Sequence, residues 1–135
     1  MNMKTKITHI QINVSNFEAS KKFYSELFGV LDWEKYMEEE GVISWTNGEF
    51  SFWMVLTEPR FIGNKFHRKN TGLNHIAFRV NSREEVNEFA NKFLSDKKET
   101  ILYNSPKEYP EYGEYYAVYF EDPDRIKLEV VYYSD

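Results

Sequence analysis

The 135-residue chain contains no cysteine. Disulfides, cysteine-ligated zinc and thiol nucleophiles are therefore excluded, and a reducing compartment is mildly favoured. No apolar run approaches the roughly 18 residues needed for a transmembrane helix. The N-terminal Met1-Asn2-Met3-Lys4 also lacks the apolar stretch of a signal peptide. We therefore expect a cytoplasmic protein with no membrane partner.

The sequence also lacks an excess of basic residues. It has 17 Lys and Arg against 22 Asp and Glu, a formal net charge of −5. A nucleic-acid-binding protein usually shows a basic surplus or a basic stripe, so nucleic acid is not an expected partner. Aromatic residues make up 18% of the chain and could fill a core, a dimer interface or the walls of a ligand pocket. The length suits one domain with a real core.

An internal repeat organises the chain. The segments His9–Val14 and His75–Val80 align without gaps, and both alternate as a strand with one buried face does. Each is followed by a capping-box pattern that predicts the start of a helix. The two patterns are Ser15-x-x-Glu18 and Ser82-x-x-Glu85.

Apolar residues at helical spacing follow both caps, and Gly29 is expected to end the first helix. Three strand-like runs come after each helix, with Asn47-Gly48 and Asp122-Pro123-Asp124 as turns before the last one. The expected strands are 30–36, 42–46 and 49–57 in the first half and 99–103, 114–120 and 126–133 in the second.

The pattern predicts an α+β fold of two βαβββ modules in tandem, with a curved mixed sheet around a metal-containing cavity. We expect module one at about 5–58, a connector at about 59–72 and module two at about 73–135. Neither half looks able to bury its sheet alone, so the expectation is one domain over 1–135.

Strand alternation brings four equivalent positions to the sheet face away from the helices. They are His9 and His75 in the opening strands, and Trp53 and Glu129 in the closing strands. Neutral imidazole and carboxylate together bind Zn, Mn, Fe(II), Co or Ni. His9, His75 and Glu129 are therefore predicted to hold one divalent metal, with open positions for water or substrate.

The chain resembles the vicinal oxygen chelate superfamily, which includes glyoxalase I, fosfomycin-resistance thiol transferases, extradiol dioxygenases, methylmalonyl-CoA epimerase and bleomycin-binding proteins. The resemblance covers nearly the whole chain. It rests on the His9 strand, Phe23-Tyr24 with Gly29, the Leu73–Phe78 strand and the segment Tyr119–Glu129. It implies that His9, His75 and Glu129 occupy ligand positions of the family.

Three positions depart from the family pattern. Trp53 stands where glyoxalase I carries an acidic ligand, which favours a two-His, one-Glu triad. Arg125 replaces a common glycine and could force a different turn. Gln11 replaces the hydroxyl residue expected beside the first ligand of a fosfomycin enzyme, which argues against fosfomycin as the substrate.

Alternatives stay open for each predicted residue. His9 and His75 could be ordinary hydrogen-bonded strand histidines, and Glu129 could pair with Lys127 or Arg79 instead of a metal. Further substrate contacts are predicted from side chains on the same face: Gln11, Trp53, Arg79 and Lys127. His67 fits a polar loop residue, and one tyrosine of the 109–119 stretch could face the cavity.

The leading functional prediction is a divalent-metal-dependent enzyme acting on a small oxygen-bearing substrate that chelates the metal. The reaction could be of the isomerase, lyase, thiol transferase or dioxygenase type. For proton transfer, the catalytic base could be Glu129, displaced from the metal, or a metal-bound water. The rival prediction is a non-catalytic small-molecule or antibiotic-binding protein of the bleomycin-resistance kind. The family resemblance also implies a homodimer.

Overall fold

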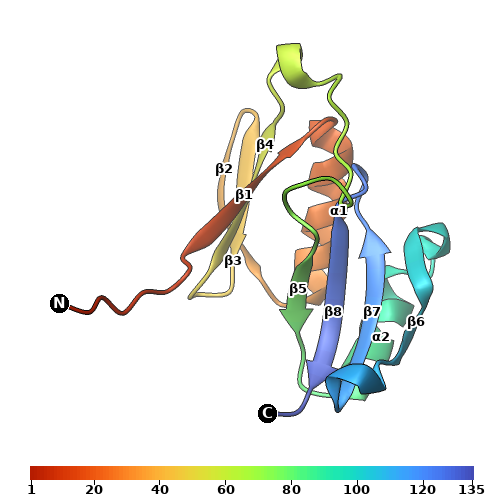
Figure 1. The fold of residues 1–135 in the computed structure, drawn as a ribbon. Helices are drawn as coiled ribbons and strands as arrows, with labels where there is room; N and C mark the ends of the chain where they lie inside the picture. The colour runs from red at the N-terminus through yellow and green to blue at the C-terminus, as the bar shows by residue number, and fades with distance from the viewer. The chain divides into compact units, whose positions relative to one another are not determined.

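The computed structural model describes residues 1–135 as two compact units, Met1–Gly63 and Asn64–Asp135 (Figure 1). Each unit contains one α-helix and one four-stranded mixed sheet, in the order βαβββ. The predicted α+β repeat is therefore confirmed.

In the first unit the sheet order is β1-β4-β3-β2. Strand β1 runs parallel to β4, and the other neighbours are antiparallel. A short 3-10 turn at Pro59–Phe61 follows the last strand. The elements are β1 (His9–Val14), α1 (Phe17–Val30), β2 (Glu34–Glu39), β3 (Val42–Thr46) and β4 (Ser51–Leu56).

The second unit repeats this topology with the order β5-β8-β7-β6, and β5 runs parallel to β8. Helix α2 lies across one face of this sheet (Figure 1). The elements are β5 (Ile76–Arg79), α2 (Arg83–Phe93), β6 (Ile101–Glu108), β7 (Tyr115–Glu121) and β8 (Lys127–Tyr133), with 3-10 turns at Lys98–Thr100 and Pro110–Tyr112. At 14 and 11 residues, neither α1 nor α2 is of a length and apolarity that would cross a membrane.

Aromatic side chains join each helix to one face of its sheet. The ring of Phe28 in α1 lies 5.2 Å from that of Phe52 in β4. In the second unit the Phe89 ring of α2 lies 5.4 Å from the Phe120 ring of β7. Burying one aromatic side chain of this size stabilises the folded state by about 2 kcal/mol or more.

The helix ends differ from two of the sequence predictions. Helix α1 begins one residue later than the Ser15 pattern suggests, because the side chain of Asn16 accepts the N–H of Ala19 at 3.1 Å. Gly29 does not end the helix, which continues to Val30 and turns at Asp32 with φ 62°. The predicted cap at Ser82 is confirmed, since its hydroxyl accepts the N–H of Glu85 at 3.1 Å.

Two strands also differ from their predicted bounds. The run expected at 30–36 forms β2 only from Glu34, because α1 extends through Val30. The run expected at 99–103 forms a longer strand, β6, interrupted by a register shift between Leu102 and Lys107. The other four strands fall within two residues of the prediction.

Both predicted turns form. The side chain of Asn47 accepts the N–H groups of Glu49 and Phe50 at 3.0 and 2.8 Å. In the second unit Asp122 accepts those of Asp124 and Ile126, both at 2.8 Å. Short polar side chains of this kind stabilise tight turns by bonding nearby backbone. The closing strands β4 and β8 start at Ser51 and Lys127, two residues and one residue after the predicted positions.

Candidate metal centre and ligand pocket

The two halves of the repeat place their closing strands in the same register. Gln11 is the partner of Trp53 in the first unit, and Ala77 is the partner of Glu129 in the second. Gln11 lies two residues after His9, and Ala77 lies two residues after His75, the histidines of the two opening strands. Trp53 and Glu129 are thus equivalent positions, as the alignment of the two halves predicts.

Glu129 is a buried acid on the sheet face opposite α2. Its neighbours Leu128 and Val130 pack on the helix side, so strand alternation directs Glu129 away from it. The side chain is nevertheless fully buried, at 0% exposure. A carboxylate removed from water is costly unless charged or hydrogen-bonding groups compensate it.

His75 provides one such group in an unusual geometry. Its Nε2 lies 3.1 Å from Glu129 Oε1, within ion-pair distance. Even so, Oε1 has no hydrogen-bond partner, so the two atoms are close without being aligned for an N–H···O bond. The other ring nitrogen, Nδ1, lies 2.6 Å from Asn74 Oδ1. An amide oxygen only accepts, so Nδ1 carries the proton and donates.

A histidine that donates from Nδ1 presents a lone pair at Nε2 when it is neutral. In this tautomer Nε2 and Glu129 Oε1 are two acceptors facing each other across a short gap. A cation bound between them satisfies both, and the donor set of imidazole and carboxylate suits a divalent transition metal. The residues present therefore fit the metal that the sequence predicts.

Tyr115 compensates the second oxygen of the same carboxylate. Its hydroxyl donates a short hydrogen bond to Glu129 Oε2. Burial of the phenol, followed by this bond to Glu129, raises the pKa of Tyr115 above its ordinary value. The phenol therefore stays protonated and holds the carboxylate in one orientation.

His9 lies in the first unit with a similar local arrangement. Its Nδ1 is 2.8 Å from the hydroxyl of Thr8, the residue that corresponds to Asn74. Its ring approaches the edge of Trp53, with centroids 6.5 Å apart. Neither unit by itself gathers three His, Asp or Glu side chains. The triad of His9 with His75 and Glu129 stays a prediction.

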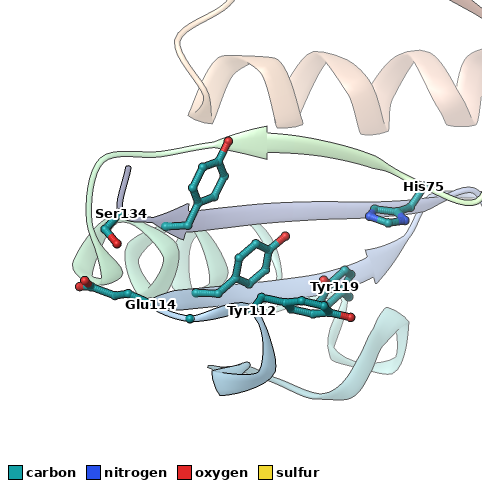
Figure 2. Close-up of a pocket in the computed structure, with 8 residues that line it drawn as sticks. His75, Tyr112, Glu114, Tyr119 and Ser134 are labelled. Atoms are coloured by element: carbon teal, nitrogen blue, oxygen red, sulfur yellow. The ribbon is translucent and has the colours of Figure 1, made fainter.

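A pocket of about 500 Å³ adjoins the His75–Glu129 pair within the second unit. Figure 2 shows His75 at one end and Glu114 with Ser134 at the other. Tyrosines form most of the wall between these ends: Tyr112, Tyr115, Tyr119 and Tyr133. Tyr112, Tyr115 and Tyr119 belong to the 109–119 stretch, from which sequence alternation could not select the residues that face the cavity, and Tyr133 comes from β8.

Tyr116 faces away from the pocket. Its hydroxyl donates to Asn87 of α2 at 2.7 Å, on the helix side of the sheet. Along β7, Tyr115 and Tyr119 share the pocket face, where the buried side chains of Ala117 and Val131 support them. The pocket wall is therefore built by one face of β7 and β8.

The predicted substrate-binding residues fall into two groups. Gln11 and Trp53 lie side by side in the first unit, where Trp53 Nε1 donates to Ser51 Oγ at 2.9 Å. Arg79 lies in the second unit, where its guanidinium is 3.9 Å from the centre of the ring of Tyr133, a pocket residue, and donates to Asp135 Oδ1 at 2.9 Å. Neither Arg79 nor Lys127 forms an ion pair with Glu129, whose partner within ion-pair distance is His75.

Lys127 lies beside the pocket wall with partners that the sequence did not reveal. Its Nζ donates to the hydroxyl of Tyr103 at 2.9 Å and lies 4.9 Å from the centre of the Tyr119 ring. Tyr103 reaches it from the irregular part of β6, where φ is 62°. Alternation fails at such a bulge, so no pattern in the sequence could have identified Tyr103.

The turn before β8 corrects another expectation. Arg125 adopts φ 66°, the left-handed conformation that a glycine would take there. The turn is therefore not rebuilt by the non-glycine residue. Arg125 Nε also donates to Glu121 Oε2 at 3.1 Å.

Comparison with known proteins agrees with this architecture. The sequence model of the Glyoxalase/Bleomycin resistance protein/Dioxygenase superfamily, which describes that protein family, matches residues 6–130. The uncharacterised protein YqjT of Bacillus subtilis (strain 168) is 35% identical over 123 residues, covering 91% of this chain and 95% of YqjT. The chain therefore belongs to this superfamily.

Solved structures share the fold. A provisionally assigned glyoxalase from Bacillus halodurans is 40% identical with a TM-score of 0.86, covering 94% of this chain and 95% of that one. A lactoylglutathione lyase from Agrobacterium tumefaciens is 19% identical with a TM-score of 0.67, covering 97% and 96%. At 19% identity, the similarity to the Agrobacterium protein supports a shared fold and nothing further.

Proposed function

We propose that this protein is a divalent-metal-dependent enzyme that acts on a small substrate through an oxygen atom bound at the metal. The observation that carries the proposal is the gap between His75 Nε2 and the buried Glu129 Oε1, 3.1 Å apart with no hydrogen bond to Oε1. His9 would complete the ligand set. The ion would be Zn, Mn, Ni, Co or Fe(II).

The metal, when bound, would polarise a substrate oxygen and stabilise negative charge that develops on it. The chain's own residues prepare the site for this. Asn74 fixes the tautomer of His75, and Tyr115 holds Glu129 by its Oε2 atom. A carboxylate held in this way can remove a proton from a substrate carbon or oxygen brought next to it, which is the base role predicted for Glu129.

The tyrosine pocket supplies the other requirement, a place for the body of the substrate. Its wall between His75 and Glu114 is largely aromatic, so it favours an apolar or planar group over a highly charged one. Reaction types that fit are isomerisation or proton transfer beside a carbonyl, lyase chemistry, thiol addition and oxidative ring cleavage.

A second candidate is a non-catalytic binding protein of the bleomycin-resistance kind. The specific observation in its favour is the same aromatic pocket, since stacked tyrosines bind planar molecules without any metal. The geometry of His75 and Glu129 favours the enzyme. A buried carboxylate oxygen without a hydrogen-bond partner is costly, and a protein that binds its ligand without a metal gains nothing to offset that cost.

Elemental analysis of protein purified without added metal or chelator tests the proposal. We expect about one equivalent of a divalent transition metal in the wild type and its loss in His75→Ala. His67→Ala is the matched control. That histidine lies in the connecting loop, where its Nδ1 accepts the N–H of Lys69 at 3.1 Å, and its removal should leave the metal content unchanged.

A wild type that contains no metal, and takes up none from Mn, Ni, Zn or Fe(II), would overturn the enzyme proposal in favour of the binder. Metal that is retained in His75→Ala would show that it binds elsewhere. A homodimer in the cytoplasm is part of the proposal, and light scattering tests the dimer.

A further inference from the structure

The sheet face that carries Glu129 continues toward a cationic end. Lys127, Glu129 and Val131 alternate onto this face, so successive side chains are about 7 Å apart along β8. Val131 leads toward the tyrosine pocket, where it packs with Tyr119. Lys127 leads the other way. The His75–Glu129 pair therefore lies between an aromatic region and an ammonium group.

Two arginines share one carboxylate at this end of the face, and Lys127 lies beside them. Glu121 is the cross-strand partner of Lys127, and its Oε2 accepts from Arg68 Nη1 at 2.7 Å and from Arg125 Nε at 3.1 Å. Lys127 forms no ion pair with Glu121 or any other acid. The local excess of positive charge is unexpected in a chain whose net charge is −5.

The side chain of Arg68 is largely buried and is fixed by an ion pair. Its side chain is 10% exposed, and that of its partner Glu121 is 15% exposed. It lies in a turn in which His67 O accepts the N–H of Asn70 at 3.0 Å and His67 Nδ1 accepts that of Lys69 at 3.1 Å. A guanidinium fixed in this way keeps further N–H donors available at little cost in side-chain entropy.

Tyr103 adds a hydroxyl to the same cluster. It adopts φ 62° and is followed by Asn104 at φ 55°, a backbone conformation that is unfavourable for a bulky residue. The result is that its hydroxyl meets Lys127 Nζ at 2.9 Å. The hydrogen bond from Lys127, with a smaller contribution from Arg68, lowers the pKa of Tyr103, which shows that the cluster favours negative charge.

From this geometry we propose that Lys127, Arg68 and the Tyr103 hydroxyl form a subsite for an oxyanion of the substrate, a carboxylate or a phosphonate. The cluster has N–H and O–H donors of the kind that bind such groups through charge-assisted hydrogen bonds. Its one acid, Glu121, is already shared between two arginines.

Together with the proposed function, on which this part of the inference rests, the anion subsite narrows the class of substrate. Its spacing from Glu129 along the strand is about one alternate-residue step, roughly 7 Å. The substrate is then a small organic acid whose chelating oxygen lies a few bonds from its anionic group. Its apolar or aromatic body occupies the tyrosine pocket.

Calorimetric titration with three probes that share a phenyl group tests the subsite. Mandelate carries a carboxylate, phenylphosphonate a phosphonate, and mandelamide replaces the charge of mandelate with a neutral amide. We expect the full-length wild type to bind one or both anions at least about tenfold more tightly than mandelamide, as charge-assisted hydrogen bonds imply. The tighter of the two anions identifies the natural group.

Variants assign the preference to the cluster. Lys127→Gln and Arg68→Gln should each reduce the preference for the anion about tenfold, and Tyr103→Phe by a smaller factor. Lys65→Gln removes an exposed cation from the same connecting loop and should leave the preference unchanged. A wild type that binds neither mandelate nor phenylphosphonate more tightly than mandelamide, or an unchanged preference in both Gln variants, would overturn the proposal.

Chelator-treated protein separates this inference from the metal. Because the cluster is independent of the ion, the preference for an anion should persist after chelation and in His75→Ala. A preference that disappears with the metal would show that the ion alone attracts the anion, and would overturn the subsite. A protein without metal that still prefers the anion would retain the subsite and refute only the metal-dependent function.

Discussion

Asn74 accepts a hydrogen bond from His75 Nδ1 at 2.6 Å, and so directs the lone pair of Nε2 toward Glu129. The two residues are neighbours in sequence, and Asn74 would pass for an ordinary polar loop residue. In a metal site, a partner that fixes the tautomer and orientation of a ligand histidine increases the affinity for the metal.

Asn74→Ala should weaken metal binding without abolishing it. Loss of the acceptor at Nδ1 frees the ring to rotate and to change tautomer, which typically lowers metal affinity by about 10–100-fold. Competition with a chromophoric chelator measures this change. Asn64→Ala, in the same exposed loop, is the control, and an affinity equal to wild type in Asn74→Ala would refute the role of Asn74.

Tyr115→Phe should destabilise the metal-free protein by about 1–3 kcal/mol. It leaves Oε2 of the fully buried Glu129 without its donor, and an unpaired buried polar group costs about that much. Urea unfolding of chelator-treated protein gives the value. The matched control is Tyr116→Phe, which removes only an exposed bond to Asn87. If both variants lose the same stability, Tyr115 does not support the carboxylate.

Stability should fall at alkaline pH because of Tyr109. Burial raises the pKa of this phenol from 10.0 to about 12. The folded state therefore favours the protonated form, and the stabilisation is complete below pH 10.0 and lost as the pH rises toward 12. Unfolding free energies measured across this interval should fall less steeply in Tyr109→Phe than in the wild type.

Tyr109→Phe also has an expected effect at neutral pH. The hydroxyl of Tyr109 is buried without a hydrogen-bond partner. Its removal should therefore leave stability unchanged or slightly raised. A marked loss at neutral pH, or an alkaline slope identical to wild type, would contradict this account of the residue.

Arg125→Gly should be more stable than Arg125→Ala. Both variants lose the contact with Glu121, so they differ in the backbone alone. At φ 66° a side chain with a Cβ is strained by about 1–2 kcal/mol, whereas glycine is not. Glycine also loses more entropy on folding, so we expect a net difference of about 1 kcal/mol. Parallel urea unfolding of the two variants measures it, and equal stabilities would show that the turn tolerates the residue.

Much of the fold could be predicted because the repeat is written in local patterns. Apolar residues at every second position marked β1 and β5, and Asn47 and Asp122 marked the turns before β4 and β8 through short-range bonds. Helix ends were harder to place. Asn16 rather than Ser15 caps α1, because the choice between adjacent capping residues depends on the path by which the chain enters the helix.

Residue order was enough to predict the βαβββ repeat and the equivalence of His9, Trp53, His75 and Glu129, because strand alternation and repeat alignment depend on nothing else. It could not select the pocket tyrosines or reveal that Tyr103 meets Lys127. Those facts depend on a bulge in β6 and on which face of β7 each ring takes. The burial of Glu129 Oε1 without a hydrogen-bond donor from the chain likewise depends on packing between strands that are distant in sequence.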